Sequence, residues 1–193
     1  MLQDVLNGDA GVADVGACAG LAALGIAAAG FRPKTIHTFE CRDADGNLRW
    51  AEEVENLTTY AGLADMLTRY WKGANYSAAF YVGLKASGTI AGSDTMASHA
   101  GWAEVAGYSQ ATRPALTLGA VTSGATASVD NSASKATFSI TASVTVAGAF
   151  VTTDSAISGT AGTLVGASDF SASRSMYSGD SLAVTVTLTA VTG

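Results

Sequence analysis

In the stretch Leu182-Ala183-Val184-Thr185-Val186-Thr187-Leu188-Thr189 a large apolar side chain recurs at every second position, mostly with threonines between, and the run 137–146 has a similar pattern. Because successive side chains of a β-strand point to opposite faces, each run predicts a strand with one apolar and one polar face. Similar runs fill residues 114–193, where clusters of Gly, Ser, Asp and Asn mark the turns. Strands punctuated this regularly predict a mainly β fold, an antiparallel β-sandwich or jelly-roll-like domain.

Composition divides the chain into three regions. Residues 1–33 form an Ala/Gly-rich N-terminal arm, residues 34–113 hold both histidines, all three tryptophans and most of the charge, and residues 114–193 form the Ser/Thr/Val-rich β region. The boundary near residues 113–114 need not separate independent domains, because strands before it can pair with strands after it. We therefore expect residues 34–193 to form one compact unit.

The middle region begins with the pattern of a β-hairpin. Residues 36–42 and 48–54 both alternate, and between them lies the acidic, Gly-containing turn Asp43–Asn47. Such a turn between two alternating runs is typical of a hairpin. Further along, residues 77–84 predict a buried strand, and the loop-rich segment 89–109 carries two expected packing anchors, Trp102 and Tyr108.

A short helix is predicted between the hairpin and the buried strand. Over residues 61–71 the large apolar side chains recur at the spacing of one helix face, namely Leu63, Met66, Leu67, Tyr70 and Trp71. This spacing predicts an amphipathic helix of about three turns that ends near Gly73.

The N-terminal arm contains one long apolar stretch, Val15–Phe31, built mostly from Ala and Gly. Asp4, Asp9 and Asp14 precede it without any Lys or Arg, so the basic start of a signal peptide is missing. A membrane span needs ~20 strongly apolar residues, and these side chains are too small for that role. We expect a small-residue arm or short helix that packs against a neighbouring chain or its own domain.

The charge of the chain limits the classes of partner that it can bind, and its two cysteines indicate no metal site. The net charge is −6 with no basic patch, which argues against nucleic acid as the main partner. Only 13% of the residues are charged, against roughly 25% in a typical soluble domain. A neutral surface suits a protein in a dense assembly, and a secreted β-protein is the alternative. Cys18 and Cys41 lack metal-site spacing, so two buried free thiols are the simplest interpretation, with a disulfide left open.

Two motifs resemble functional sites without their full pattern. Residues 178–182 contain the letters Gly-Asp-Ser-Leu of a serine esterase family, whose histidine lies far downstream of the serine. Here eleven residues follow Leu182 and none is His, so a turn that leads into a strand explains the string. The Asp43–Asn47 turn lacks the Gly at position six and the Glu at position twelve of an EF-hand calcium loop.

The positions of the carboxylates and histidines in the sequence also give no catalytic arrangement. Adjacent glutamates on a strand point to opposite faces, so Glu52 and Glu53 cannot line one glycosidase cleft, and a solvated strand edge or salt-bridge rim is expected there, with Glu55. His99 lies near Asp94 in sequence, but no nucleophile accompanies them, and we expect His99 to bond loop backbone beside Trp102. We therefore predict no catalytic, cofactor-binding or metal residues, and no enzyme.

Several short sequence motifs resemble those of a known group of proteins. The strings are Phe39–Trp50, Glu55–Leu57 with Gly62-Leu63, Ala78–Leu84, Asp94–Trp102, Thr112–Pro114, Val129–Ala136, Gly148–Phe150 and Gly162–Leu164. With them, residues 39–193, about four fifths of the chain, resemble a group of structural proteins from tailed-bacteriophage virions. Met1–Arg32 departs from that group, where a shorter and more polar start is usual.

The resemblance implies a capsid decoration (cement) protein or a small head–tail accessory component, without catalytic residues. We expect a non-enzymatic cement protein, made in the bacterial host cytoplasm, that binds the major capsid protein on the capsid exterior. It is expected to form a homo-oligomer, with a trimer as the predicted state, and to bind neither nucleic acid, membrane nor cofactor. The alternatives are a tail adaptor or fibre-base component, or a host-surface carbohydrate-binding module that stacks sugars on exposed aromatics, among them Trp50, Trp71, Trp102 and Tyr108.

Overall fold

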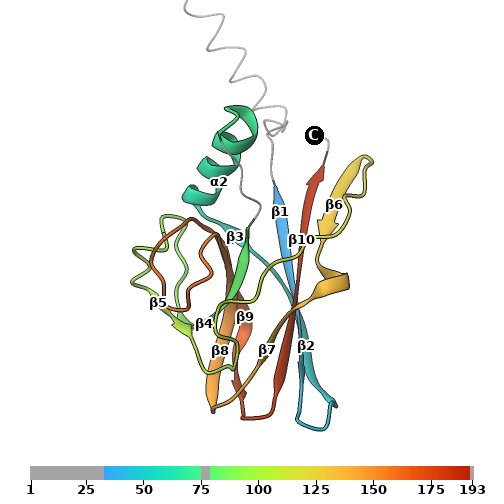
Figure 1. The fold of residues 1–193 in the computed structure, drawn as a ribbon, viewed down its shortest axis with the longest axis vertical. Coiled ribbons are helices and arrows are strands. Elements are labelled where there is room, and N and C mark those ends of the chain that lie inside the picture. Colours follow the sequence, from blue (N-terminus) through green and yellow to red (C-terminus); the bar gives the residue numbers. More distant parts are fainter. Residues whose placement is uncertain (1–32, 75–78, 192–193) are drawn as a thin grey trace, which may run out of the picture.

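Two antiparallel sheets pack face to face as a β-sandwich (Figure 1). The structure is a computed structural model and describes residues 33–74 and 79–191. The predicted arm, including Val15–Phe31 and Cys18, therefore lies outside the described residues. The antiparallel β-sandwich expected from the alternating runs is confirmed.

The first sheet is organised around β10 (Ser181–Val191), the strand that contains the alternating stretch 182–189. Its order is β2-β1-β10-β6, and β7 also pairs with β10; the other bounds are β1 Lys34–Arg42, β2 Leu48–Glu55, β6 Thr126–Asp130 and β7 Ala136–Ser139. Leu182, Val184 and Val186 point into the core, as the alternation predicts. Because β1 pairs with β10 along its whole length, strands from both sides of residue 113 share this sheet.

The second sheet has the order β3-β9-β8-β4-β5. Its strands are β3 Leu57–Thr58, β4 Tyr81–Gly88, β5 Trp102–Val105, β8 Val144–Thr152 and β9 Leu164–Met176. The buried strand predicted at 77–84 exists, but as β4 it begins at Tyr81, and residues 75–78 are not described.

The run 137–146 is not one strand, which corrects the prediction from its alternation. It is divided between β7 in the first sheet and β8 in the second. The break falls at Ile140, whose backbone N–H donates to the Asp180 carbonyl while the Gly179 N–H donates back to Ile140. The next N–H, of Thr141, donates to the Gly107 carbonyl. These bonds turn the chain from one sheet to the other.

The hairpin is confirmed at its predicted position. β1 and β2 pair antiparallel, and the Asp43 carboxylate accepts hydrogen bonds from the backbone N–H groups of Asp45 and Asn47. Gly46 has a φ of +86°, a conformation that favours glycine. The Asp43 side chain is thus occupied in closing the turn.

The predicted helix is present, and part of its apolar stripe is exposed. α2 (Tyr60–Met66) continues directly into a π-helical segment, η1 (Leu67–Trp71). The helix contacts β9 through Gly62, its only buried residue, where an added Cβ would lie 2.2 Å from the Val165 carbonyl oxygen. The helix approaches the sheet most closely at this glycine, and Leu63, Leu67 and Trp71 lie exposed on another side of the helix.

Candidate binding cleft and helix face

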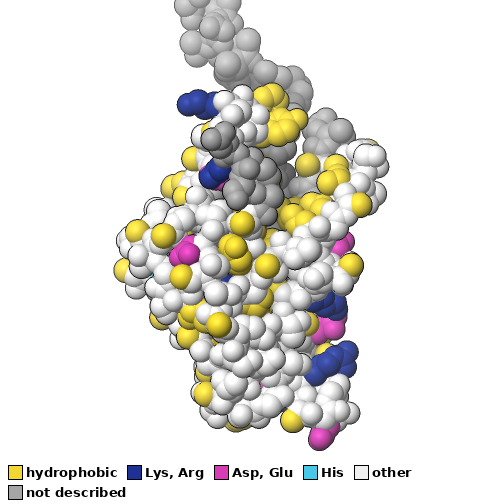
Figure 2. All heavy atoms as spheres, viewed as in Figure 1, with side chains coloured by type: hydrophobic (Ala, Val, Ile, Leu, Met, Phe, Trp, Pro, Cys, Tyr) yellow, Lys and Arg dark blue, Asp and Glu magenta, His cyan; other side chains and the backbone are white. Residues whose placement is uncertain are grey.

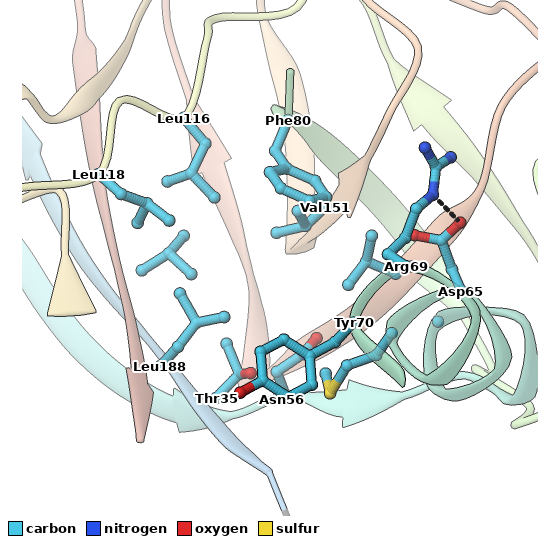
Figure 3. Close-up of a pocket in the computed structure, with 14 residues that line it drawn as sticks. Thr35, Asn56, Asp65, Arg69, Tyr70, Phe80, Leu116, Leu118, Val151 and Leu188 are labelled. Carbon is cyan, nitrogen blue, oxygen red and sulfur yellow. Dashed lines mark hydrogen bonds and ion pairs between the residues drawn. The ribbon is translucent and has the colours of Figure 1, made fainter. Parts of the chain in front are cut away.

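An apolar cleft of about 470 Å³ opens between the two sheets at the end that carries α2. Val186 and Leu188 of β10 line one wall, and Val151 of β8 and Val165 of β9 line the other. Figure 3 shows the side chains of Phe80, Leu116, Leu118 and Leu188 directed into the cavity. Thr35, Asn56, Gly62, Asp65, Met66, Arg69 and Tyr70 complete the lining. Its volume lies in the range of roughly 300–1,000 Å³ that is typical of binding sites.

Polar groups are few in this cleft. Asp65 and Arg69 form an ion pair one helical turn apart, with 3.1 Å between the Arg69 Nε and an Asp65 carboxylate oxygen (Figure 3). Asn56 is buried, and its Oδ1 accepts no hydrogen bond from any described residue. An unpartnered buried acceptor is costly, by about 1–3 kcal/mol, so this oxygen would favour a ligand that brings a donor.

The helix also presents apolar side chains to solvent. We call Leu63, Leu67 and Trp71 the outer helix face; their exposed fractions are 38%, 53% and 74%. Tyr70 packs edge-on against Trp71, with 5.3 Å between the ring centroids. Hydrophobic side chains gather at this end of the molecule, over the helix and between the helix and β6 (Figure 2). Exposed apolar clusters of this kind mark interaction surfaces.

Thr59 fixes where the helix begins. Its hydroxyl accepts a hydrogen bond from the Gly62 backbone N–H and donates to the Leu164 carbonyl of β9. One side chain therefore caps the helix and ties it to the second sheet. The outer helix face and the cleft are held in a defined relation to the sandwich by this contact and by Gly62.

The candidate reaction groups are placed elsewhere and serve the fold. His99 lies 3.0 Å from the Trp102 carbonyl oxygen and stacks on its indole, which confirms the backbone contact expected for it. Asp94 accepts hydrogen bonds from Trp102 Nε1 and from the Ala91 N–H, so its carboxylate orients the indole. The structure brings none of these groups to the cleft.

The carboxylates on β2 are divided between two faces, as predicted. Glu52 accepts hydrogen bonds from Arg174 and from the Ser171 backbone N–H, which links β2 to β9 across the sheets and holds the Glu52 pKa below its usual range. Glu53 is exposed, and Glu55 pairs with Lys34 at 3.3 Å. The expected salt-bridge rim is confirmed for Glu52 and Glu55.

The remaining motifs also have structural roles. Residues 177–180 form a turn in which Gly179 has a φ of +96°, and Ser181 opens β10, as predicted for the Gly-Asp-Ser-Leu string. The Cys41 thiol is fully buried in the core, and burial raises its pKa to about 11. This bears out the buried-thiol interpretation for Cys41.

Most of the aromatic platforms proposed for sugar stacking are unavailable. Trp102 and Tyr108 are buried, and Trp50 packs edge-on against Phe170 on one side and contacts Arg174 through its ring face. Trp71 alone of the four is well exposed. The carbohydrate-binding alternative loses the two buried residues.

Within residues 33–74 and 79–191 no group of three or more His, Cys, Asp or Glu side chains is arranged to hold a metal ion. In the same part of the chain no helix is long and apolar enough to cross a bilayer. Comparisons with protein-family models, with curated proteins and with solved structures found no match.

Sequence reasoning did not find the cleft. Its lining comes from the start of β1, the helix, Phe80, the segment around Leu116 and Leu118, and three strands of both sheets. No two of these segments are identifiable from the sequence as neighbours across the sandwich end. The only available signal was Leu118 and Leu188, apolar positions at the edge of runs otherwise rich in small residues.

Proposed function

We propose that the protein is a decoration (cement) protein of a tailed-bacteriophage capsid, attached to the shell by the helix-bearing end of its sandwich. The observation that carries this proposal is the outer helix face, where Leu63, Leu67 and Trp71 are exposed on a helix anchored to the sheet at Gly62. A rigid block that ends in an apolar surface suits an adhesive role. The resemblance of residues 39–193 to virion structural proteins supplies the biological setting.

The attachment would be driven by burial of apolar surface. Burial contributes roughly 25 cal/mol per Å², and specific interfaces bury about 1,200–2,000 Å² in total. The low charge of the chain reduces the desolvation cost of such a contact. The proposed partner is the major capsid protein, the proposed location the capsid exterior, and a trimer around a local three-fold axis would share the load.

The test measures binding of the purified full chain to capsids that lack it, by co-sedimentation. Leu67→Asp is expected to weaken binding at least about tenfold, because ~1.4 kcal/mol is lost for each factor of ten and a buried charge costs more than that. Leu48→Asp is the matched control. Leu48 is a surface leucine with 54% exposure, close to the 53% of Leu67, but it lies at the start of β2 beside the hairpin turn. Equal binding by both variants would contradict the proposed attachment surface.

A tail adaptor or fibre-base component is the second candidate within virions. The same outer helix face would then contact a ring at a single vertex, and capsids without tails would not bind the protein.

A further inference from the structure

We propose that the apolar stretch Val15–Phe31 of the same chain docks into the cleft between the sheets. The stretch lies outside the described residues, and the inference concerns the isolated protein, so it is independent of the proposed capsid role. The proposal rests on the place where the chain enters the sandwich, on the composition of the cleft wall, and on a polar group in the cleft that has no partner among the described residues.

The connection between the stretch and the cleft is short. Thr35, the second residue of β1, itself lines the cleft. Phe31 precedes Thr35 by four positions, which span at most ~14 Å, and Ile26 precedes Thr35 by nine positions, which span at most ~32 Å. This length of chain is enough for the stretch to reach the cleft from Thr35.

The chemistry of the stretch matches the cleft wall. Val15–Phe31 contains no charged residue, and its larger side chains are Leu21, Leu24, Ile26 and Phe31. The apolar cleft wall is formed by valines of both sheets, by Leu188 of β10, by Leu116 and Leu118 of the connection between β5 and β6, and by Phe80. Burial of one Leu, Ile or Phe side chain contributes about 1.5–3 kcal/mol, and the neighbouring Ala and Gly residues let a backbone approach closely.

The unpartnered Asn56 oxygen favours a peptide over a hydrocarbon ligand. Asn56 Oδ1 is buried in the cleft lining and accepts no hydrogen bond from the described residues. A polypeptide segment carries a donor N–H at nearly every residue, whereas a lipid chain carries none. Occupation by Val15–Phe31 can satisfy this acceptor and bury the apolar wall at the same time.

The tether also favours the protein's own segment over that of a second copy. A short flexible linker gives an effective concentration in the millimolar range, far above the concentration of free protein in a dilute sample. Docking within one molecule is therefore expected to win at micromolar concentration, and it leaves the outer helix face free.

The test places a photo-crosslinking residue in the full-length protein at Ile26, and in a second sample at Leu21. Irradiation at low micromolar concentration is expected to give monomer-mass products joined to cleft residues, such as Met66, Leu118 or Leu188. The same probe at Val5 is the control, because Val5 shares the tether but precedes the apolar stretch. Its yield at the cleft should be lower by about tenfold, the factor that ~1.4 kcal/mol of docking free energy gives.

A second pair of variants tests whether the cleft itself is the receptor. Leu118→Asp places a charge on the cleft wall, in the connection between β5 and β6, and is expected to reduce the Ile26 crosslinks about tenfold. Thr117→Asp changes an exposed neighbour outside this cleft lining and should leave the yield unchanged. Dimer-mass products would assign the cleft to a second copy. Products scattered over the surface, absent from the cleft, or equally frequent from Val5 would also overturn the proposal.

Discussion

Arg113 shows how much of this fold depends on single buried charges. Its guanidinium makes two parallel hydrogen bonds of 2.8 Å to the Glu104 carboxylate and donates to the backbone carbonyls of Asp154 and Gly159. Both side chains of the pair are almost fully buried. One residue thus joins β5 to the long connection between β8 and β9.

Replacing Arg113 is expected to destabilise the fold strongly, because Glu104 would be left buried without its counter-ion. Arg113→Ala should lower the free energy of unfolding by about 3–5 kcal/mol. Lys34→Ala removes a cation from an exposed pair and should cost at most ~1 kcal/mol. Urea unfolding of both variants measures the difference. A loss for Arg113→Ala as small as that for Lys34→Ala would contradict the structural role assigned to this network.

His37 is expected to make stability depend on pH. The imidazole is buried between the sheets, with Nδ1 2.8 Å from the Ser168 hydroxyl oxygen, and burial lowers its pKa from 6.5 to about 4. Between these two values the unfolded chain binds more protons than the folded one, so the free energy of unfolding falls as the pH falls from 6.5 to 4. The slope reaches at most about 1.4 kcal/mol per pH unit.

The His37 contribution is isolated by comparison with His37→Leu. In His37→Leu the free energy of unfolding should depend less steeply on pH in this window, by the amount that the uptake of one proton on unfolding contributes. Ser168→Ala keeps the imidazole buried and should retain most of this pH dependence. Carboxylates such as Glu52, whose pKa is lowered, contribute in all three proteins, since protonating them also favours unfolding as the pH falls. Identical slopes for the wild type and His37→Leu would show that His37 is not buried in its neutral form.

At the scale of elements, the helix is positioned by its smallest residue. Gly62→Ala would raise helix propensity by up to about 1 kcal/mol, yet the new Cβ would lie 2.2 Å from a backbone oxygen of β9. We expect a net loss of about 1–3 kcal/mol in the free energy of unfolding, measured by thermal or urea unfolding, because this neighbour is backbone and cannot rotate away.

Ala64→Gly provides the control for Gly62→Ala, since Ala64 is exposed on the same helix and should show only the propensity cost of roughly 0.5–1 kcal/mol. A gain in stability for Gly62→Ala would mean that the helix does not pack closely on β9 at Gly62.

The helix was predicted correctly, whereas the run 137–146 was wrongly expected to form one strand. Periodicity identifies residues that share a face, but it does not identify what that face contacts. Leu63 and Leu67 share a helix face as predicted, although Gly62 allows a closer approach on another side. The run 137–146 alternates in the way that both sheets require, so its division at Ile140 depends on backbone bonds to a distant turn.

At the scale of the whole molecule, the alternation of β10, the hairpin around Asp43–Asn47 and the helix near Leu63 were enough to predict a β-sandwich with one short helix. The cleft could not be predicted, because its walls are formed only when β10, β8 and β9 are brought together by long-range pairing. Local patterns predict elements, whereas a cavity at the end of a sandwich depends on how sheets and connections are arranged.

The central claim is that this protein decorates a capsid shell, and its copy number in purified virions tests that claim most directly. The measurement is quantitative gel densitometry of this chain against the major capsid protein. A shell protein at lattice positions is expected at a ratio of about one to one or about one to three. A ratio of about one to fifty, corresponding to roughly six to twelve copies in a ring at one vertex, would place the protein in the tail and contradict the account.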